Sequence, residues 1–272
     1  MPMTTQQQII DALAIEQNFD AQQEVERRID FLARYLEDTG TQALVLGISG
    51  GVDSTTAGRL CQLAVERVRE RGGKATFYAM RLPYGEQHDE DDAQAAINYI
   101  RADKQLDVNI KLSADGMLEG LEQGGLEFND EYQRDFVHGN IKARARMIAQ
   151  YAVAGRHNGL VVGTDHGAEA VMGFFTKHGD GACDVTPLAG LNKRRVRAIL
   201  SVLDGPEVLV NKVPTADLES LSPGRTDEDA LGVSYDQIDD FLEGREIDSE
   251  AAQRIISTYD RTAHKRELPR AP

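Results

Sequence analysis

The stretch SGGVDS at residues 49–54 brings together the residue types that bind a phosphate group. It directly follows the apolar run ALVLGI, which predicts a buried strand, and it precedes residues with a helical pattern. At such a strand end, the consecutive backbone N–H groups of residues 50–53 can surround an anion, and the hydroxyls of Ser49 and Ser54 add donors. A glycine-rich turn without a ligand would not explain the two serines and the aspartate. The stretch therefore predicts a phosphate-binding loop.

Asp53 is the unusual member of this loop, because a carboxylate repels a phosphate unless a divalent cation lies between them. The loop therefore predicts Mg²⁺. A second carboxylate, Glu169 in GTDHGAE, follows another apolar stretch and can share the cation, with Thr164 facing the nucleotide. The alternative is that Thr164 and Asp165 only cap the next helix. His166 is interpreted as a hydrogen-bonded structural residue rather than a ligand.

Lys193, in LNKRRVR, falls in the first turn of an expected helix. A cation at that position opposes the helix dipole, so its presence needs another reason. A bound phosphate group would supply that reason, and Lys193 is therefore a candidate for opposing phosphate charge.

Alternating apolar strands and amphipathic helices must position these motifs. We expect strands at 42–49, 75–83, 106–112 and 159–166, and helices at 20–40, 54–71, 90–101 and 138–155, followed by helical segments at 190–206, 207–218, 234–244 and 248–260. This alternation predicts an α/β fold with a doubly wound, Rossmann-like parallel sheet flanked by helices, in a single domain over residues 1–272. The loops near 83–90 and 218–232 are expected to be mobile.

Composition excludes several classes of protein. The 30 basic and 45 acidic residues give a net charge of −15, which argues against nucleic acid as a partner. Cys61 and Cys183, without a CxxC, provide neither a disulfide framework nor a zinc site. No apolar run reaches the ~18 residues of a membrane span, and we expect a cytoplasmic protein. The phosphate-loop pattern GxxxxGK[ST] and the dinucleotide pattern GxGxxG are both absent, which argues against an NAD-dependent dehydrogenase.

SGGVDS resembles the SGGxDS signature of the PP-loop ATP pyrophosphatases. Further motifs narrow the resemblance: RLPYGEQHDEDDAQ, GNIKARARMIAQY, GTDHGAEAVMGFFTKHGDGACDVTPLAGLNKR, PTADL and TAHKR. Their order is similar to that in ammonia-dependent NAD⁺ synthetases, over nearly the whole chain. The resemblance implies a homodimer that adenylates deamido-NAD⁺ with ATP and releases pyrophosphate. Ammonia would then displace AMP to give NAD⁺.

The resemblance also implies roles for individual residues, with Asp53 and Lys193 as catalytic residues. Asp180 is added to the catalytic residues because its position makes it the candidate acceptor of a proton from ammonium. The ATP-binding residues would be Gly47, Ile48, Ser49, Gly50, Gly51, Val52, Asp53, Ser54, Arg81, Gln87, Thr164, Lys193 and Thr215. Deamido-NAD⁺ would contact Arg144, Lys177, Asp184, His264 and Lys265. The Mg²⁺ ligands would be Asp53, Glu169, Asp180 and Thr215.

Some assignments stay open at this level. Either Phe174 or Phe175 is expected to stack on the nicotinate ring, with Tyr35 and Phe136 as weaker candidates for lining that pocket. A tRNA-modifying ligase or sulfurtransferase of the same superfamily would predict a basic RNA-binding surface. A nucleotide sensor on the same fold would tend to lack a metal carboxylate or the lysine that opposes the pyrophosphate.

Overall fold

The computed structural model describes residues 4–85, 90–215, 218, 220–221, 224–269 and 271. Its strands are β1 (Ala43–Gly47), β2 (Thr76–Arg81), β3 (Lys104–Asp107) and β4 (Gly159–Val161). Its helices are α1 (Gln6–Ala12), α2 (Ala21–Thr39), α3 (Val52–Glu70), α4 (Glu90–Ile100), α5 (Lys111–Gln123), α6 (Glu131–Arg156), α7 (Gly167–Met172), α8 (Lys193–Val202), α9 (Glu207–Val210), α10 (Asp227–Leu231), α11 (Tyr235–Leu242), α12 (Ser249–Arg261) and α13 (Ala263–Arg266).

The four strands form one parallel sheet in the order β3-β2-β1-β4. The chain builds outward from β1 to β2 and β3, and then returns to add β4 on the other side of β1. The chain thus adds β2 and β3 on one side of β1 and β4 on the other, which makes the β1/β4 boundary a topological switch point. The expected parallel α/β fold is confirmed.

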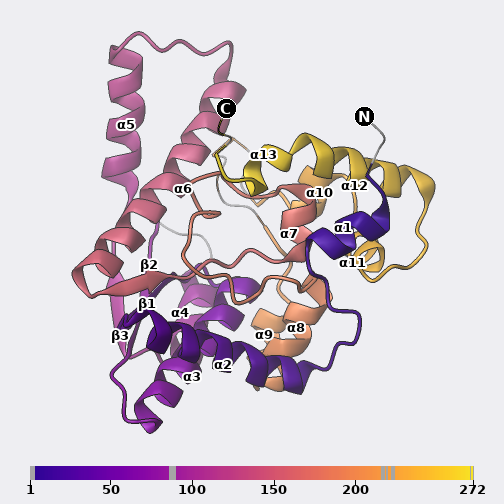
Figure 1. Ribbon diagram of the computed structural model, residues 1–272. Coiled ribbons are helices and arrows are strands. Elements are labelled where there is room, and N and C mark those ends of the chain that lie inside the picture. The colour runs from indigo at the N-terminus through magenta and orange to yellow at the C-terminus, as the bar shows by residue number, and fades with distance from the viewer. Residues whose placement is uncertain are drawn as a thin grey trace.

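Helices cover both faces of this sheet (Figure 1). Successive side chains of β1 point to opposite faces, so Leu44 and Leu46 pack with α2 and α3, while Val45 packs with α6. All three side chains are buried, as expected for a strand covered on both faces. The predicted helix at 20–40 begins at the cap Asp20 and ends at Gly40, whose φ of 67° closes it.

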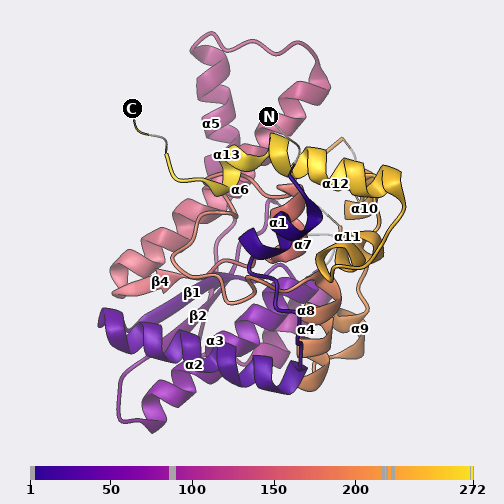
Figure 2. The same ribbon diagram turned by 45° about the vertical axis from the view of Figure 1, so that its right-hand side comes forward.

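A separate helical layer stands beside the sheet and is built from α1, α7, α11 and α12 (Figure 2). Its buried core includes Val171 of α7, Ile238 and Phe241 of α11, and Ile255 of α12. This layer carries Glu169 on α7, and α11 also contacts α8. It therefore connects one side of the phosphate-binding loop to the C-terminal helices.

Three expectations about secondary structure were wrong. The third strand lies at Lys104–Asp107 rather than 106–112, and Lys111 already begins α5, which the sequence did not reveal. Alternating Leu106, Val108, Ile110 and Leu112 mimicked a strand, but only Ile110 of these is fully buried and Leu112 is 89% exposed. The helix expected at 138 begins at Glu131, and the segment 207–218 is helical only over Glu207–Val210.

Two further expectations concern mobility and membranes. Parts of the loops near 83–90 and 218–232 lie outside the described residues, and their mobility stays a prediction. Among the described helices, none combines the length and apolar character that a bilayer crossing would require.

Candidate active site

A cavity of about 510 Å³ opens at the carboxyl ends of β1 and β4. Its wall combines the loop after β1, the start of α7, the start of α8 and the segment around Thr215. Because parallel strands present their carboxyl ends at one edge, loops that are distant in sequence meet there. Of the predicted site residues, the cavity wall includes Gly47, Ile48, Ser49, Gly51, Val52, Asp53, Ser54, Thr164, Glu169, Asp180, Lys193, Thr215 and Lys265.

The predicted phosphate-binding loop is held in shape by its own serines. Gly51 N–H donates to Ser49 Oγ at 3.3 Å, and the two hydroxyls of Ser49 and Ser54 lie 3.1 Å apart. Gly50 adopts a φ of 87°, and a Cβ there would lie 2.6 Å from the backbone nitrogen of Ala93 in α4. Glycine is thus required by both conformation and space. Since α3 starts at Val52, the N–H groups of its first turn face this loop without partners inside the helix.

Four ionisable side chains converge beside the loop. Lys193 Nζ donates to Asp53 Oδ2 at 2.7 Å. His166 Nε2 lies 3.4 Å from Asp53 Oδ1, 3.6 Å from Glu169 Oε2 and 3.3 Å from Lys193 Nζ. His166 and Lys193 are each 1% exposed. These residues come from α3, from the start of α7 and from α8, so the tertiary fold alone assembles them.

His166 is the N-cap of α7, with Nδ1 accepting the N–H of Glu169 at 3.4 Å. Thr164 and Asp165 are therefore not the cap that the sequence offered as an alternative. The other ring nitrogen, Nε2, faces both carboxylates and the ammonium of Lys193. His166 is thus hydrogen-bonded within the fold, and no local motif indicated that its Nε2 would face Asp53 and Glu169.

The pKa values of Asp53 and Glu169 are shifted in opposite directions. Burial opposes ionisation of Asp53, but Lys193 and His166 together outweigh it and hold the pKa of Asp53 well below its usual range. Burial, aided by the charge of nearby Asp53, raises the pKa of Glu169 to about 8. Burial also opposes the charge of Lys193, yet Asp53 and Glu169 together raise the Lys193 pKa. The cluster is thus one coupled set of charges.

The carboxylates fit a divalent cation. Asp53 Oδ1 and Glu169 Oε2 are both buried and accept no hydrogen bond from the described residues. Together with His166, they place three potential ligand atoms within 4.8 Å of one another. Unpaired buried carboxylate oxygens are costly, and oxygen ligands of this kind are those that Mg²⁺ prefers. The structure brings Asp53 and Glu169 together as predicted.

Asp180 and Thr215, the other two predicted metal ligands, line the same cavity but stand apart from this cluster. Asp180 is exposed, and its Oδ1 accepts the N–H of Thr176 at 3.0 Å. Thr215 forms an isolated backbone bridge with Thr226, which ties the segment after α9 to the start of α10. Their roles as metal ligands stay predictions.

The predicted substrate residues gather near the C-terminal helices. Arg144 donates to the carbonyl of Lys177 at 3.1 Å, and Lys177 Nζ donates to the carbonyl of His264 at 2.5 Å. Lys265 Nζ donates to the carbonyls of Gly173 and Phe175, both at 2.8 Å, and lies 5.4 Å from the Phe175 ring centre. These contacts bring α6, the segment after α7 and α13 together around the loop that carries the two phenylalanines.

Two predicted residues have other partners, and one cannot be placed. Asp184 accepts the N–H of Val161 at 2.7 Å at the end of β4. Arg81 is buried and forms an ion pair with Glu90 in the first turn of α4. Neither lines the cavity as described, while Gln87 lies outside the described residues.

Three of the four candidate aromatic residues line the cavity, namely Phe136, Phe174 and Phe175. Tyr35 lies in a different groove, beside Phe31 on α2, with ring centres 6.0 Å apart. The sequence analysis missed Asp227, which lines the cavity and whose Oδ2 accepts a hydrogen bond from the Tyr235 hydroxyl at 2.8 Å. No local motif marked Asp227, because α10 reaches the cavity only through the tertiary fold.

Comparisons with known proteins agree with this geometry. The family described as NAD synthase matches residues 24–269. An NH₃-dependent NAD⁺ synthetase of Streptomyces coelicolor is 62% identical over 98% of this chain and 97% of its own. Its counterpart in Paraburkholderia phytofirmans is 59% identical over 100% of this chain and 95% of its own.

Two solved structures extend the comparison. The crystal structure of an NAD⁺ synthetase from Burkholderia pseudomallei is 57% identical, with a TM-score of 0.84 over 97% of this chain and 96% of that chain. An NMN synthetase from Francisella tularensis is 32% identical, with a TM-score of 0.81 over 94% of this chain and 99% of that chain. With the family match extending over most of its length, and with its cavity built from the motifs first seen in the sequence, the chain belongs to the NAD synthase family.

Proposed function

We propose that this protein is an ammonia-dependent NAD⁺ synthetase, which amidates deamido-NAD⁺ to NAD⁺ at the expense of ATP. The observation that carries the proposal is the meeting of the glycine-rich loop, Asp53, Glu169 and Lys193 in one cavity at the switch point of the sheet. This arrangement suits a reaction that brings two polyanions together. The proposal places the protein in the cytoplasm, where ATP is available.

The reaction has two steps. An oxygen of the nicotinate carboxylate attacks the α-phosphorus of ATP, and pyrophosphate leaves, so that the carboxylate becomes an acyl adenylate. Ammonia then attacks the acyl carbon, the bond to AMP breaks, and one proton is released. None of these steps needs a covalent nucleophile from the protein.

The residues of the cavity have distinct tasks in the first step. The loop at 49–54 binds phosphate oxygens through its N–H groups and hydroxyls, and Lys193 opposes the charge of the departing pyrophosphate. Asp53 and Glu169 would hold Mg²⁺, with Asp180 and Thr215 as further candidate ligands. When bound, the cation would neutralise phosphate charge.

Deamido-NAD⁺ occupies the part of the cavity near α13 in this proposal. Lys177, Lys265 and Arg144 bring positive charge to that side. Phe174 or Phe175 stacks on the nicotinate ring, and His264 and Asp184 complete the assigned substrate set. Arg81 and Gln87 remain assigned to ATP. Near neutral pH ammonia is mostly ammonium, so a carboxylate must accept a proton, and the exposed Asp180 is our candidate.

The proposal includes a homodimer. Phe31 and Tyr35 are stacked and stand 45% and 37% exposed on α2, and Tyr132, Phe136 and Ile148 are exposed on α6. Exposed apolar side chains of this kind support a protein interface. Sedimentation analysis is expected to give a particle of two chains, and a monomer at micromolar concentration would contradict this part.

The decisive experiment is a product assay with ATP, Mg²⁺, deamido-NAD⁺ and ammonium. We expect NAD⁺, AMP and pyrophosphate in equal amounts, ammonium much preferred over glutamine, and no product from Asp53→Ala. Nicotinate mononucleotide serves as a second acceptor in parallel. Faster turnover of the mononucleotide would redirect the substrate assignment, and ATP cleavage only with added tRNA would overturn it.

A further inference from the structure

Helix α8 begins with an electrostatic conflict. Its first three residues are Lys193, Arg194 and Arg195, and cations at a helix N-terminus oppose the helix dipole. Lys193 is also almost fully buried, so its charge gains little from solvent. A helix with this start needs an acceptor for its first N–H groups and a fixed negative charge nearby.

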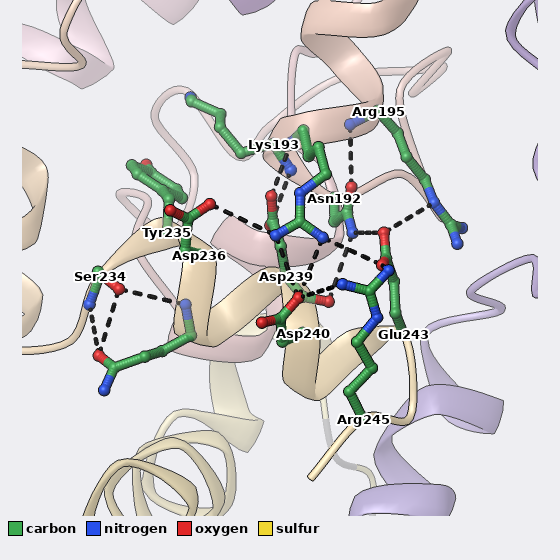
Figure 3. A network of polar contacts seen from close by, with 12 residues as sticks. Asn192, Lys193, Arg195, Ser234, Tyr235, Asp236, Asp239, Asp240, Glu243 and Arg245 are labelled. Carbon is green, nitrogen blue, oxygen red and sulfur yellow. Dashed lines mark hydrogen bonds and ion pairs between the residues drawn. The ribbon is translucent and has the colours of Figure 1, made fainter. Parts of the chain in front are cut away.

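The carboxylate of Asp239, from α11, meets both needs (Figure 3). Its Oδ1 accepts the N–H of Lys193 at 3.1 Å, and its Oδ2 accepts the N–H of Arg194 at 2.7 Å. Asn192 accepts the third N–H, that of Arg195, at 3.0 Å. Each of the first three N–H groups of α8 thus donates to a side chain, and Asp239 is only 1% exposed. The position of the Lys193 backbone is therefore set from α11.

Helix α11 also contacts the other end of Lys193. Tyr235 lies one turn before Asp239 and on the same face of α11, as residues four apart do. Its ring centre is 4.8 Å from Lys193 Nζ, the arrangement of a cation–π contact. Its hydroxyl donates to Asp227 Oδ2 at 2.8 Å, which fixes the orientation of the ring. Helix α11 thus contacts Lys193 both at its backbone nitrogen and at its ammonium.

We propose that Asp239 and Tyr235 are positioning residues that aim the Lys193 ammonium at Asp53 and at the phosphate-binding loop. This rests on the proposed function only in giving Lys193 a role toward ATP phosphate. A residue that merely filled space here would be apolar, because a buried carboxylate carries a desolvation cost. Burial indeed raises the pKa of Asp239 to about 6, against the two N–H groups that lower it.

The first test uses Asp239→Asn, which keeps the size of the side chain but replaces one carboxylate oxygen by an NH₂ group. One backbone N–H of α8 then faces a second donor instead of an acceptor. Asp240→Asn is the matched control, since Asp240 is next along α11 and pairs with Arg194 and Arg245 without contacting the α8 backbone. We expect ATP–pyrophosphate exchange in the presence of deamido-NAD⁺ to fall about tenfold or more in Asp239→Asn. The KM for ammonium should stay unchanged, and Asp240→Asn should match wild type.

A double-mutant cycle separates positioning from general destabilisation. In a Lys193→Met background, adding Asp239→Asn should lower the residual exchange by less than about twofold. An undiminished effect in that background would overturn the proposal, as would equal effects of Asp239→Asn and Asp240→Asn. Tyr235→Phe should retain most of the exchange rate and Tyr235→Leu should not, because the ring rather than the hydroxyl faces the ammonium.

A labelling measurement tests the same inference without the proposed reaction. Acetic anhydride at pH 8, with mass spectrometric detection, reports how accessible and how fixed the Lys193 amine is. We expect Lys193 to label several-fold faster in Asp239→Asn and Tyr235→Leu than in wild type and Asp240→Asn. Unchanged labelling would overturn the inference even in an active enzyme. Absence of NAD⁺ formation by wild type, with the labelling difference intact, would instead overturn the proposed function.

Discussion

The ammonium of Lys193 lies 2.7 Å from the carboxylate of Asp53, although the two residues are 140 positions apart in the sequence. Both belong to first turns of helices, α8 and α3, whose N-termini point at the same cavity. The pair therefore places one positive and one negative group where phosphate and cation would be handled together. Four predictions follow from it and from its surroundings.

Replacing Asp53 by Asn should destabilise the protein as well as inactivate it. The change leaves the buried Lys193 without its closest anion, and breaking a buried ion pair costs roughly 3–5 kcal/mol. Adding Lys193→Met should restore part of the free energy of unfolding, measured in urea, without restoring NAD⁺ formation. A double variant no more stable than Asp53→Asn would contradict this account of the pair.

Replacing Glu169 by Gln should weaken binding of a divalent cation. Glu169 Oε2 and Asp53 Oδ1 are the two buried oxygens without a hydrogen-bond donor among the described residues, so we expect Mn²⁺, as a spectroscopic substitute for Mg²⁺, to bind about tenfold or more weakly. Electron paramagnetic resonance measures free Mn²⁺ directly, without turnover. Glu250→Gln, exposed on α12, is the control, and equal losses in both variants would place the cation elsewhere.

Replacing Gly50 by Ala should lower activity with ATP by more than backbone strain alone would. Gly50 and Gly72 share a φ of 87°, but only at Gly50 would the new methyl group meet backbone, 2.6 Å from Ala93 N. Gly72→Ala should cost about 1 kcal/mol of stability and leave activity intact. Gly50→Ala should lose about 100-fold in kcat/KM for ATP, because the loop must move. Similar activities of the two variants would show that the loop tolerates displacement.

The stability difference between wild type and Asp239→Asn should depend on pH. The fold raises the pKa of Asp239 from 3.8 to about 6, so its contribution to stability is full below about pH 4 and is lost as the pH rises through 6. The amide cannot titrate. Wild type should therefore lose about 3 kcal/mol relative to the variant between about pH 4 and pH 7. Urea unfolding across this range measures the change, and a constant difference would contradict the raised pKa.

The sequence alone predicted the elements whose information is local. The phosphate-binding loop is readable because an apolar strand, glycines and a helix start are contiguous in residues 43–54. The helix at Ala21–Thr39 is bounded by its own cap and its own terminal glycine. Helix α5 was missed because Gly116 and Gly120 weaken its helical signal, and because the alternation before it resembled a strand.

The partners within the site were decided by the tertiary structure. Asp53, Glu169 and Lys193 were each identified from a local motif, and the parallel sheet explains why their loops share one edge. By contrast, nothing near His166 in the sequence indicates that its Nε2 would face both carboxylates, and nothing near Asp239 indicates that it would cap α8. A hydrogen bond between distant segments depends on how helices pack. The spacing of side chains along one segment does not predict that packing. The sequence thus determined which chemical groups the site contains, and the packing of α7, α8 and α11 determined where each of them points.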